Sequence, residues 1–92
     1  MYVAEVYLPR ARADEARAAG QRARAAAEAL AGEDGAIRYV RTTFVPDDET
    51  CFHVFEAGTA ALVEEAVRRA GLGAARVVPA LEASGLADEA GR

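Results

Sequence analysis

The residues best suited to chemistry are the only cysteine and the only histidine of the chain, Cys51 and His53. They lie two positions apart in the run TCFHVFEA, residues 50–57, whose β-branched and aromatic residues are typical of a strand. Side chains at positions i and i+2 of a strand lie on the same face of a sheet. Thiol and imidazole are therefore expected to point the same way, and both are ligands that suit Ni(II), Cu and Zn.

An acidic turn, Pro46-Asp47-Asp48-Glu49, comes directly before this run and offers oxygen ligands. We predict that a metal site, if the chain has one, uses His53, Cys51, Asp47 and Asp48. A strand supplies two ligands at most, so the turn or a second subunit must complete the coordination. The sequence also allows a packing interpretation, in which Cys51 is a small buried hydrophobe and His53 a core histidine.

A second group combines charged and aromatic residues: Glu5, Tyr39, Arg41 and Glu56. Strand alternation predicts that they lie on the opposite sheet face, where Glu5 and Glu56 come from neighbouring strands. Two close carboxylates raise the pKa of one of them, as general acid–base catalysis requires. If the chain is an enzyme, we predict these four as its catalytic residues. The simpler interpretation is that Arg41 forms a structural ion pair with one of the carboxylates.

The elements that must position these residues follow a βαββαβ order. Strands are predicted at 2–8, 36–45, 50–57 and 75–81, and helices at 12–31 and 59–70. This order is that of an α+β, ferredoxin-like fold, with a four-stranded antiparallel sheet in the order 4-1-3-2 and two helices on one face. Pro79 falls in the last strand, at a sheet edge, where a strand proline is tolerated. We expect residues 1–82 to form this domain and residues 83–92 a flexible C-terminal tail.

The central hairpin and the sheet faces follow from the same alternation. The four-residue turn pairs Val45 with Thr50, which sets Arg41 opposite Val54 and Tyr39 opposite Glu56. The more apolar face, expected to contact the helices, comprises Ala4, Val6, Leu8, Val40, Phe44, Cys51, His53 and Phe55. The other face mixes aromatic and charged residues: Val3, Glu5, Tyr7, Tyr39, Arg41, Thr43, Phe52, Val54 and Glu56. We predict that this helix-free face forms a homodimer interface or binds a small molecule.

Composition excludes several classes of function. The 92 residues carry a net charge of −4 and a pI near 4.9, which argues against a nucleic-acid partner. The glycines lack phosphate-binding spacing, so we expect no nucleotide cofactor. A lone cysteine forms no intrachain disulfide, and no apolar run is long enough to span a membrane. These features predict a cytoplasmic protein. The arginines at 10, 12, 17, 22 and 24 are expected to lie mostly on a solvated helix face.

Several segments also resemble a family of small ferredoxin-like proteins of unknown function that is described as nickel-binding. The resemblance covers about residues 2–81. It rests on Tyr2-Val3-Ala4-Glu5, Leu8-Pro9, Ile37-Arg38-Tyr39-Val40-Arg41, the acidic turn, His53-Val54-Phe55-Glu56-Ala57 and Arg68-Arg69-Ala70-Gly71-Leu72. It implies a dimeric protein with a metal or small-ligand site. His53 stands where the family pattern has a cysteine, and Cys51 lies two residues earlier.

These observations favour a small cytoplasmic homodimer that binds a transition metal, nickel or else zinc or copper. The alternative is a dimeric ferredoxin-like isomerase or cyclase, or a small-molecule-binding protein, that acts on a hydrophobic metabolite of a biosynthetic pathway. An interaction module without a ligand is a third hypothesis. Whether the chain is an enzyme stays open at this point.

Overall fold

A computed structural model describes residues 1–33 and 35–83. Its elements are four strands, two helices and two 3₁₀ turns: β1 (Tyr2–Tyr7), η1 (Arg10–Glu15), α1 (Ala16–Glu33), β2 (Ile37–Val45), η2 (Pro46–Asp48), β3 (Thr50–Ala57), α2 (Ala60–Arg69) and β4 (Ala75–Pro79). Residues 84–92 of the predicted tail lie outside the described residues.

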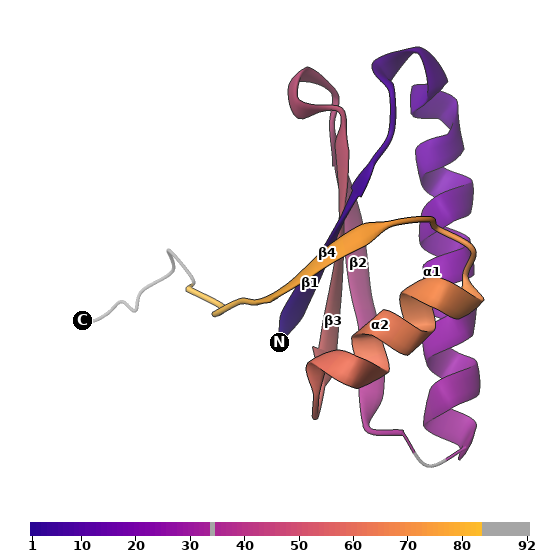
Figure 1. The fold of residues 1–92 in the computed structure, drawn as a ribbon, viewed down its shortest axis with the longest axis vertical. Helices are drawn as coiled ribbons and strands as arrows, with labels where there is room; N and C mark the ends of the chain where they lie inside the picture. The colour runs from indigo at the N-terminus through magenta and orange to yellow at the C-terminus, as the bar shows by residue number, and fades with distance from the viewer. Residues whose placement is uncertain (34, 84–92) are drawn as a thin grey trace.

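The strands form one antiparallel sheet in the order β2-β3-β1-β4. This confirms the predicted α+β, ferredoxin-like arrangement, including the position of Pro79 in an edge strand. Figure 1 shows α1 running along the sheet and α2 beside it, on the same side. The register of the hairpin is also as predicted at its tip, where Val45 pairs with Thr50, and at Arg41, which pairs with Val54.

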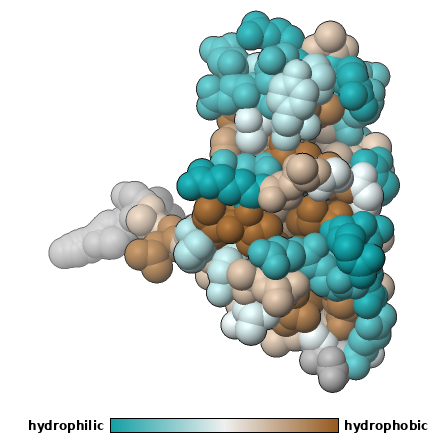
Figure 2. Space-filling model, in the orientation of Figure 1, coloured by the Kyte–Doolittle hydropathy of each residue, from teal (hydrophilic) through white to brown (hydrophobic). Residues whose placement is uncertain are grey.

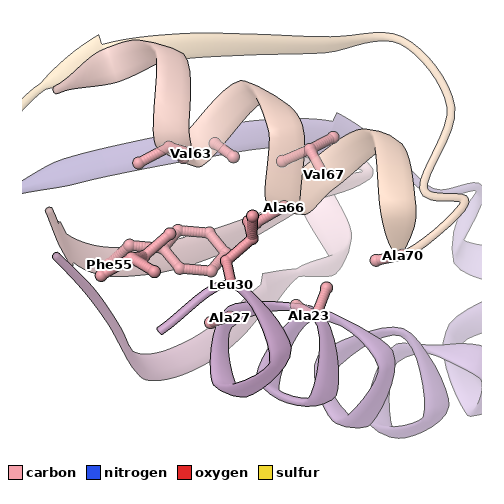
Figure 3. Packing of buried hydrophobic residues seen from close by; sticks show 11 residues of the cluster. Ala23, Ala27, Leu30, Phe55, Val63, Ala66, Val67 and Ala70 are labelled. Atoms are coloured by element: carbon pink, nitrogen blue, oxygen red, sulfur yellow. The ribbon is translucent and has the colours of Figure 1, made fainter. Parts of the chain in front are cut away.

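The core lies between the sheet and the two helices. Phe55 has no exposed surface and projects from β3 toward small residues of both helices, among them Ala27 and Ala66 (Figure 3). The alanines let α1 and α2 approach the sheet closely, and the larger side chains Leu30 and Val63 fill the remaining space. A thin core of this kind makes the position of each helix sensitive to single side chains.

The two helices begin differently. α2 lies within the predicted range 59–70. The Thr59 side chain caps it by accepting a hydrogen bond from the Leu62 amide at 3.3 Å, and Gly71 takes a left-handed φ of 67° after the last turn. The predicted start of the first helix at Arg12 is wrong. The backbone there is non-helical, with φ −114° and ψ 27°, so a 3₁₀ segment precedes α1.

A β-bulge interrupts β2 between Tyr39 and Arg41. Because a bulge adds one residue to one strand, the strict alternation expected over this strand fails there. Tyr39 therefore pairs with Phe55 and Arg38 with Glu56, which corrects the predicted pairing of Tyr39 with Glu56. The consequence is that Tyr39 and Thr42, three positions apart, both lie on the side of the helices.

One face of the molecule exposes hydrophobic surface beside hydrophilic surface (Figure 2). Figure 2 shows apolar surface gathered at mid-height, where β4 crosses the sheet in Figure 1, and polar surface over the hairpin end above it. Within residues 1–33 and 35–83, neither helix has the length and apolar character to cross a membrane.

Candidate functional site

Cys51 and His53 lie at one pocket between the sheet, the start of α1 and the turn after α2. We call it the His53 pocket; its volume is about 210 Å³. Its lining residues are Val6, Tyr7, Leu8, Pro9, Arg12, Glu15, Ala19, Arg22, Cys51, His53, Gly71 and Leu72. The strand prediction that placed the thiol and the imidazole on one face is thus matched by the structure.

The imidazole of His53 is completely buried and only half satisfied. Its Nδ1 lies 2.7 Å from the Thr42 hydroxyl, which in turn lies 2.7 Å from the Tyr39 hydroxyl. Within residues 1–33 and 35–83, its Nε2 has no hydrogen-bond partner. Because buried polar atoms are almost always paired, an orphaned ring nitrogen at a pocket calls for a partner from outside the chain, such as a ligand or a water molecule. With Nδ1 engaged on the β2 side, Nε2 is the nitrogen left for that ligand.

Gly20 allows α1 to lie against this hydrogen-bonded chain. A Cβ atom at residue 20 would come within 3.0 Å of the Thr42 hydroxyl oxygen and 3.1 Å of the Tyr39 hydroxyl. The helix backbone thus covers the hydroxyls and fixes their positions. A glycine inside a helix normally weakens it, and here the missing side chain makes room for this contact.

Burial sets the protonation states at the floor of the pocket. Burial, together with the nearby positive charge of Arg22, lowers the pKa of His53 to about 4. The imidazole is therefore neutral at pH 7, as a metal ligand must be. Burial also raises the pKa of the Cys51 thiol, so a cation would have to displace its proton.

The rim of the pocket carries charge. Arg12 and Glu15 form a paired hydrogen bond with a shortest distance of 2.6 Å, which lowers the pKa of Glu15. The Nε of Arg22 donates to the backbone carbonyl of Ala70 at 3.0 Å. Among the described residues, no carboxylate lies within ion-pair distance of Arg22. The pocket thus presents one cation that is not neutralised by a side chain.

The acidic turn does not contribute to this pocket. Asp47 and Asp48 are exposed in η2, and neither lines the pocket. In residues 1–33 and 35–83, the structure gathers no group of three or more His, Cys, Asp or Glu side chains that could hold a metal. The turn acid with a structural role is Glu49, whose carboxylate accepts a hydrogen bond from the Arg10 amide at 2.8 Å and whose φ is 48°.

The second predicted group is dispersed. Glu56 pairs with Arg38 at 2.9 Å and Glu5 with Arg76 at 3.5 Å, so within the described part of one chain Arg41 contacts neither carboxylate. Tyr39 lies on the other side of the sheet, where its ring packs edge-on against Phe55 with centroids 5.9 Å apart. The bulge in β2 explains the position of Tyr39, whereas Arg41 keeps its predicted pairing with Val54 and the two carboxylates pair with other arginines. The four residues therefore form no constellation within the described part of a single chain.

Thr42, Glu15 and Arg22 are residues of the site that were not predicted. The predicted pairing of Val45 with Thr50 already sets Thr42 opposite His53, so the hairpin register was the signal that could have found Thr42, and the bulge brings Tyr39 to the same side. Glu15 and Arg22 are seven residues apart, a spacing that places two side chains on one face of a helix, but an Arg-rich surface helix gives many such pairs. Only the packing of α1 on the sheet singles these two out.

A comparison with family models gives one relationship. The model described as "Nickel responsive protein SCO4226-like" matches residues 2–79. The chain belongs to this family. Comparison with curated proteins and with solved structures gave no match. The matched residues run from β1 to β4, so the family's pattern spans the whole sheet and both helices, including Cys51 and His53.

The family name raises the question of whether the His53 pocket suits nickel. His53 fits, since a metal-binding histidine usually engages its other ring nitrogen in a hydrogen bond, and Nδ1 would donate here to the Thr42 hydroxyl while Nε2 binds the metal. Cys51 supplies a second donor that suits nickel once its proton is lost. These two would hold the ion, and the remaining positions are left for groups from outside the pocket floor.

Proposed function

We propose that the chain is a nickel-type transition-metal-binding protein, and that the metal binds to His53 and Cys51 in the His53 pocket. The observation that carries this proposal is the buried, unpartnered Nε2 of His53 at a pocket that also contains the only thiol. Membership in a nickel-responsive family supports the choice of metal.

The roles of the surrounding residues follow from their contacts. Thr42 holds Nδ1 of His53 and so orients the ring, and Tyr39 extends that hydrogen-bonded chain. Such outer contacts fix the ring orientation of a ligand histidine and usually change metal affinity by about 10- to 100-fold when removed. Burial of the thiol and imidazole keeps the site selective for ions that bind soft donors over Mg²⁺ and Ca²⁺.

The decisive variant is His53→Asn. An asparagine amide can replace the Nδ1 contact with Thr42 but has no atom at the position of Nε2. We expect nickel affinity to fall by at least about tenfold in calorimetric titrations, with a smaller effect on folding. Cys51→Ser should in addition remove the near-ultraviolet charge-transfer band of a nickel–thiolate bond.

The matched control is the double variant Asp47→Asn, Asp48→Asn, which removes two carboxylates outside the pocket. We expect its nickel affinity to equal that of the unaltered protein. If the control loses affinity while His53→Asn keeps it, the metal binds at the acidic turn and the pocket assignment is wrong.

A further inference from the structure

The His53 pocket offers too few donor atoms to complete the coordination of a bare metal ion. It also contains a positive charge, that of Arg22, which no carboxylate of the described residues pairs with. Cys51 and His53 are its two soft donors, and the described residues form no three-donor group. Arg22 lines the same pocket, and the only hydrogen bond found for its side chain in the described residues goes to the Ala70 carbonyl. A guanidinium close to a metal ion repels it unless an anion lies between them.

The side chain of Arg22 is held in place by one hydrogen bond, and its other N–H donors make no hydrogen bond within the described residues. The bond from its Nε to Ala70 lies at the last turn of α2, where an arginine satisfies a free carbonyl. This contact takes one of the five N–H donors of the side chain. The remaining donors form the planar fork that recognises carboxylates in pairs of hydrogen bonds.

The charges at the rim of the pocket leave a positive excess. Glu15 lies near enough to Arg22 for the guanidinium to lower the pKa of its carboxyl, but two nitrogens of Arg12 already bind this carboxylate, so the two arginines outnumber the one acid. The pocket volume of about 210 Å³ is several times the volume of one water molecule, so it has room for a small organic molecule in addition to an ion. A single ligand that has metal-binding donors and a negative charge would supply the missing donors and balance the surplus positive charge.

We propose that the pocket takes nickel together with a small carboxylate-bearing chelator of the amino-acid type, whose carboxylate binds Arg22 while His53 and Cys51 bind the metal. This inference rests on the proposed function and names the form in which the metal is bound. The chelator supplies the donors that the chain lacks, and its negative charge separates the metal from the guanidinium.

Two chelators of similar size test the proposal. Glycine binds nickel through an amine and a carboxylate, whereas ethylenediamine binds it through two amines and has no carboxylate. We expect nickel titrated with glycine to bind the protein about tenfold more tightly than nickel titrated with ethylenediamine, after correction for the stability of each chelate. Equilibrium dialysis should retain radiolabelled glycine only when nickel is present.

Arg22→Met keeps the apolar stem of the side chain and removes the guanidinium, so it should abolish the preference for glycine. Arg24→Met, an exposed change on the same helix outside this pocket, is the matched control and should retain the preference. Thermal unfolding of both variants reports whether either has failed to fold, and Arg22→Lys, which keeps the charge, should retain part of the preference.

The outcomes separate this inference from the proposed function. If nickel alone binds at His53 and glycine neither binds with it nor depends on Arg22, the chelator inference is overturned and the metal site stands. If no form of nickel binds, both are overturned.

Discussion

His53 combines complete burial with a positively charged neighbour, and both oppose its protonation. The pKa of the folded imidazole is about 4, whereas the ordinary value is 6.5. A group that the unfolded chain protonates more readily than the folded chain makes stability depend on pH. The burial that leaves Nε2 available for a ligand therefore lowers the stability of the folded chain at acidic pH.

We predict that stability falls as pH decreases from 6.5 to 4. Well above pH 6.5 His53 is neutral in both states and contributes no slope, whereas within this window the unfolded chain takes up the proton more readily than the folded chain. The total loss from this residue is about 3 kcal/mol at most. Urea unfolding as a function of pH measures it, with His53→Gln as the reference protein. Equal slopes for the two proteins between pH 4 and 6.5 would show that His53 is not the group responsible.

At the scale of elements, the contact between α1 and β2 depends on a missing side chain at residue 20. Alanine normally stabilises a helix interior relative to glycine by about 1 kcal/mol. Here the added methyl group would meet the Thr42 and Tyr39 hydroxyls at 3.0 and 3.1 Å, so the helix or the hydroxyls must shift. Overpacking typically costs about 1 to 3 kcal/mol, which outweighs the gain in propensity.

We predict that Gly20→Ala lowers the melting temperature and that Gly32→Ala does not. Gly32 lies in the same helix, and a Cβ atom there would have no neighbour within 4 Å. Thermal unfolding followed by circular dichroism compares the two variants. A stabilised Gly20→Ala protein would mean that α1 does not press on the Tyr39–Thr42 pair in solution.

The elements were largely predictable and the site only in part. Two-residue alternation in β1 and β3, the Thr59 cap and the glycine after α2 are local signals, and they fixed the topology and the shared face of Cys51 and His53. The bulge at Val40 has no comparable local signal, so Tyr39 was assigned to the wrong face. The position of Arg22 in the lining of the pocket depends on how α1 lies over the sheet, which is a property of tertiary packing.

At the scale of the whole molecule, the sheet has one face without helices. Residues there include Val3 and Phe52, which are half-buried in a single chain, and Val54, which is 5% exposed. A partly apolar face of this kind is suited to a second copy of the chain. Homodimerisation through this helix-free face stays a prediction, which the structure of a single chain does not test.

We predict a dimer at micromolar concentration that Phe52→Arg converts to a monomer. The substitution places a charge on the helix-free face, away from the His53 pocket on the other side of the sheet. Sedimentation equilibrium gives the mass, and the nickel titration described above provides the control for folding. A monomeric unaltered protein, or a dimer that tolerates Phe52→Arg, would contradict the predicted interface.

The bulge in β2 also bears on how relatives should be aligned. Without Val40 the strand would alternate regularly, and Tyr39 and Thr42 would still lie on the helix side. A one-residue deletion at this point therefore leaves the support of His53 in place, whereas the same deletion between Thr42 and the hairpin tip would turn Thr42 away from it. Length variation in this family should accordingly be tolerated at residue 40, and an ungapped comparison across it would assign the wrong partners to every residue on one side.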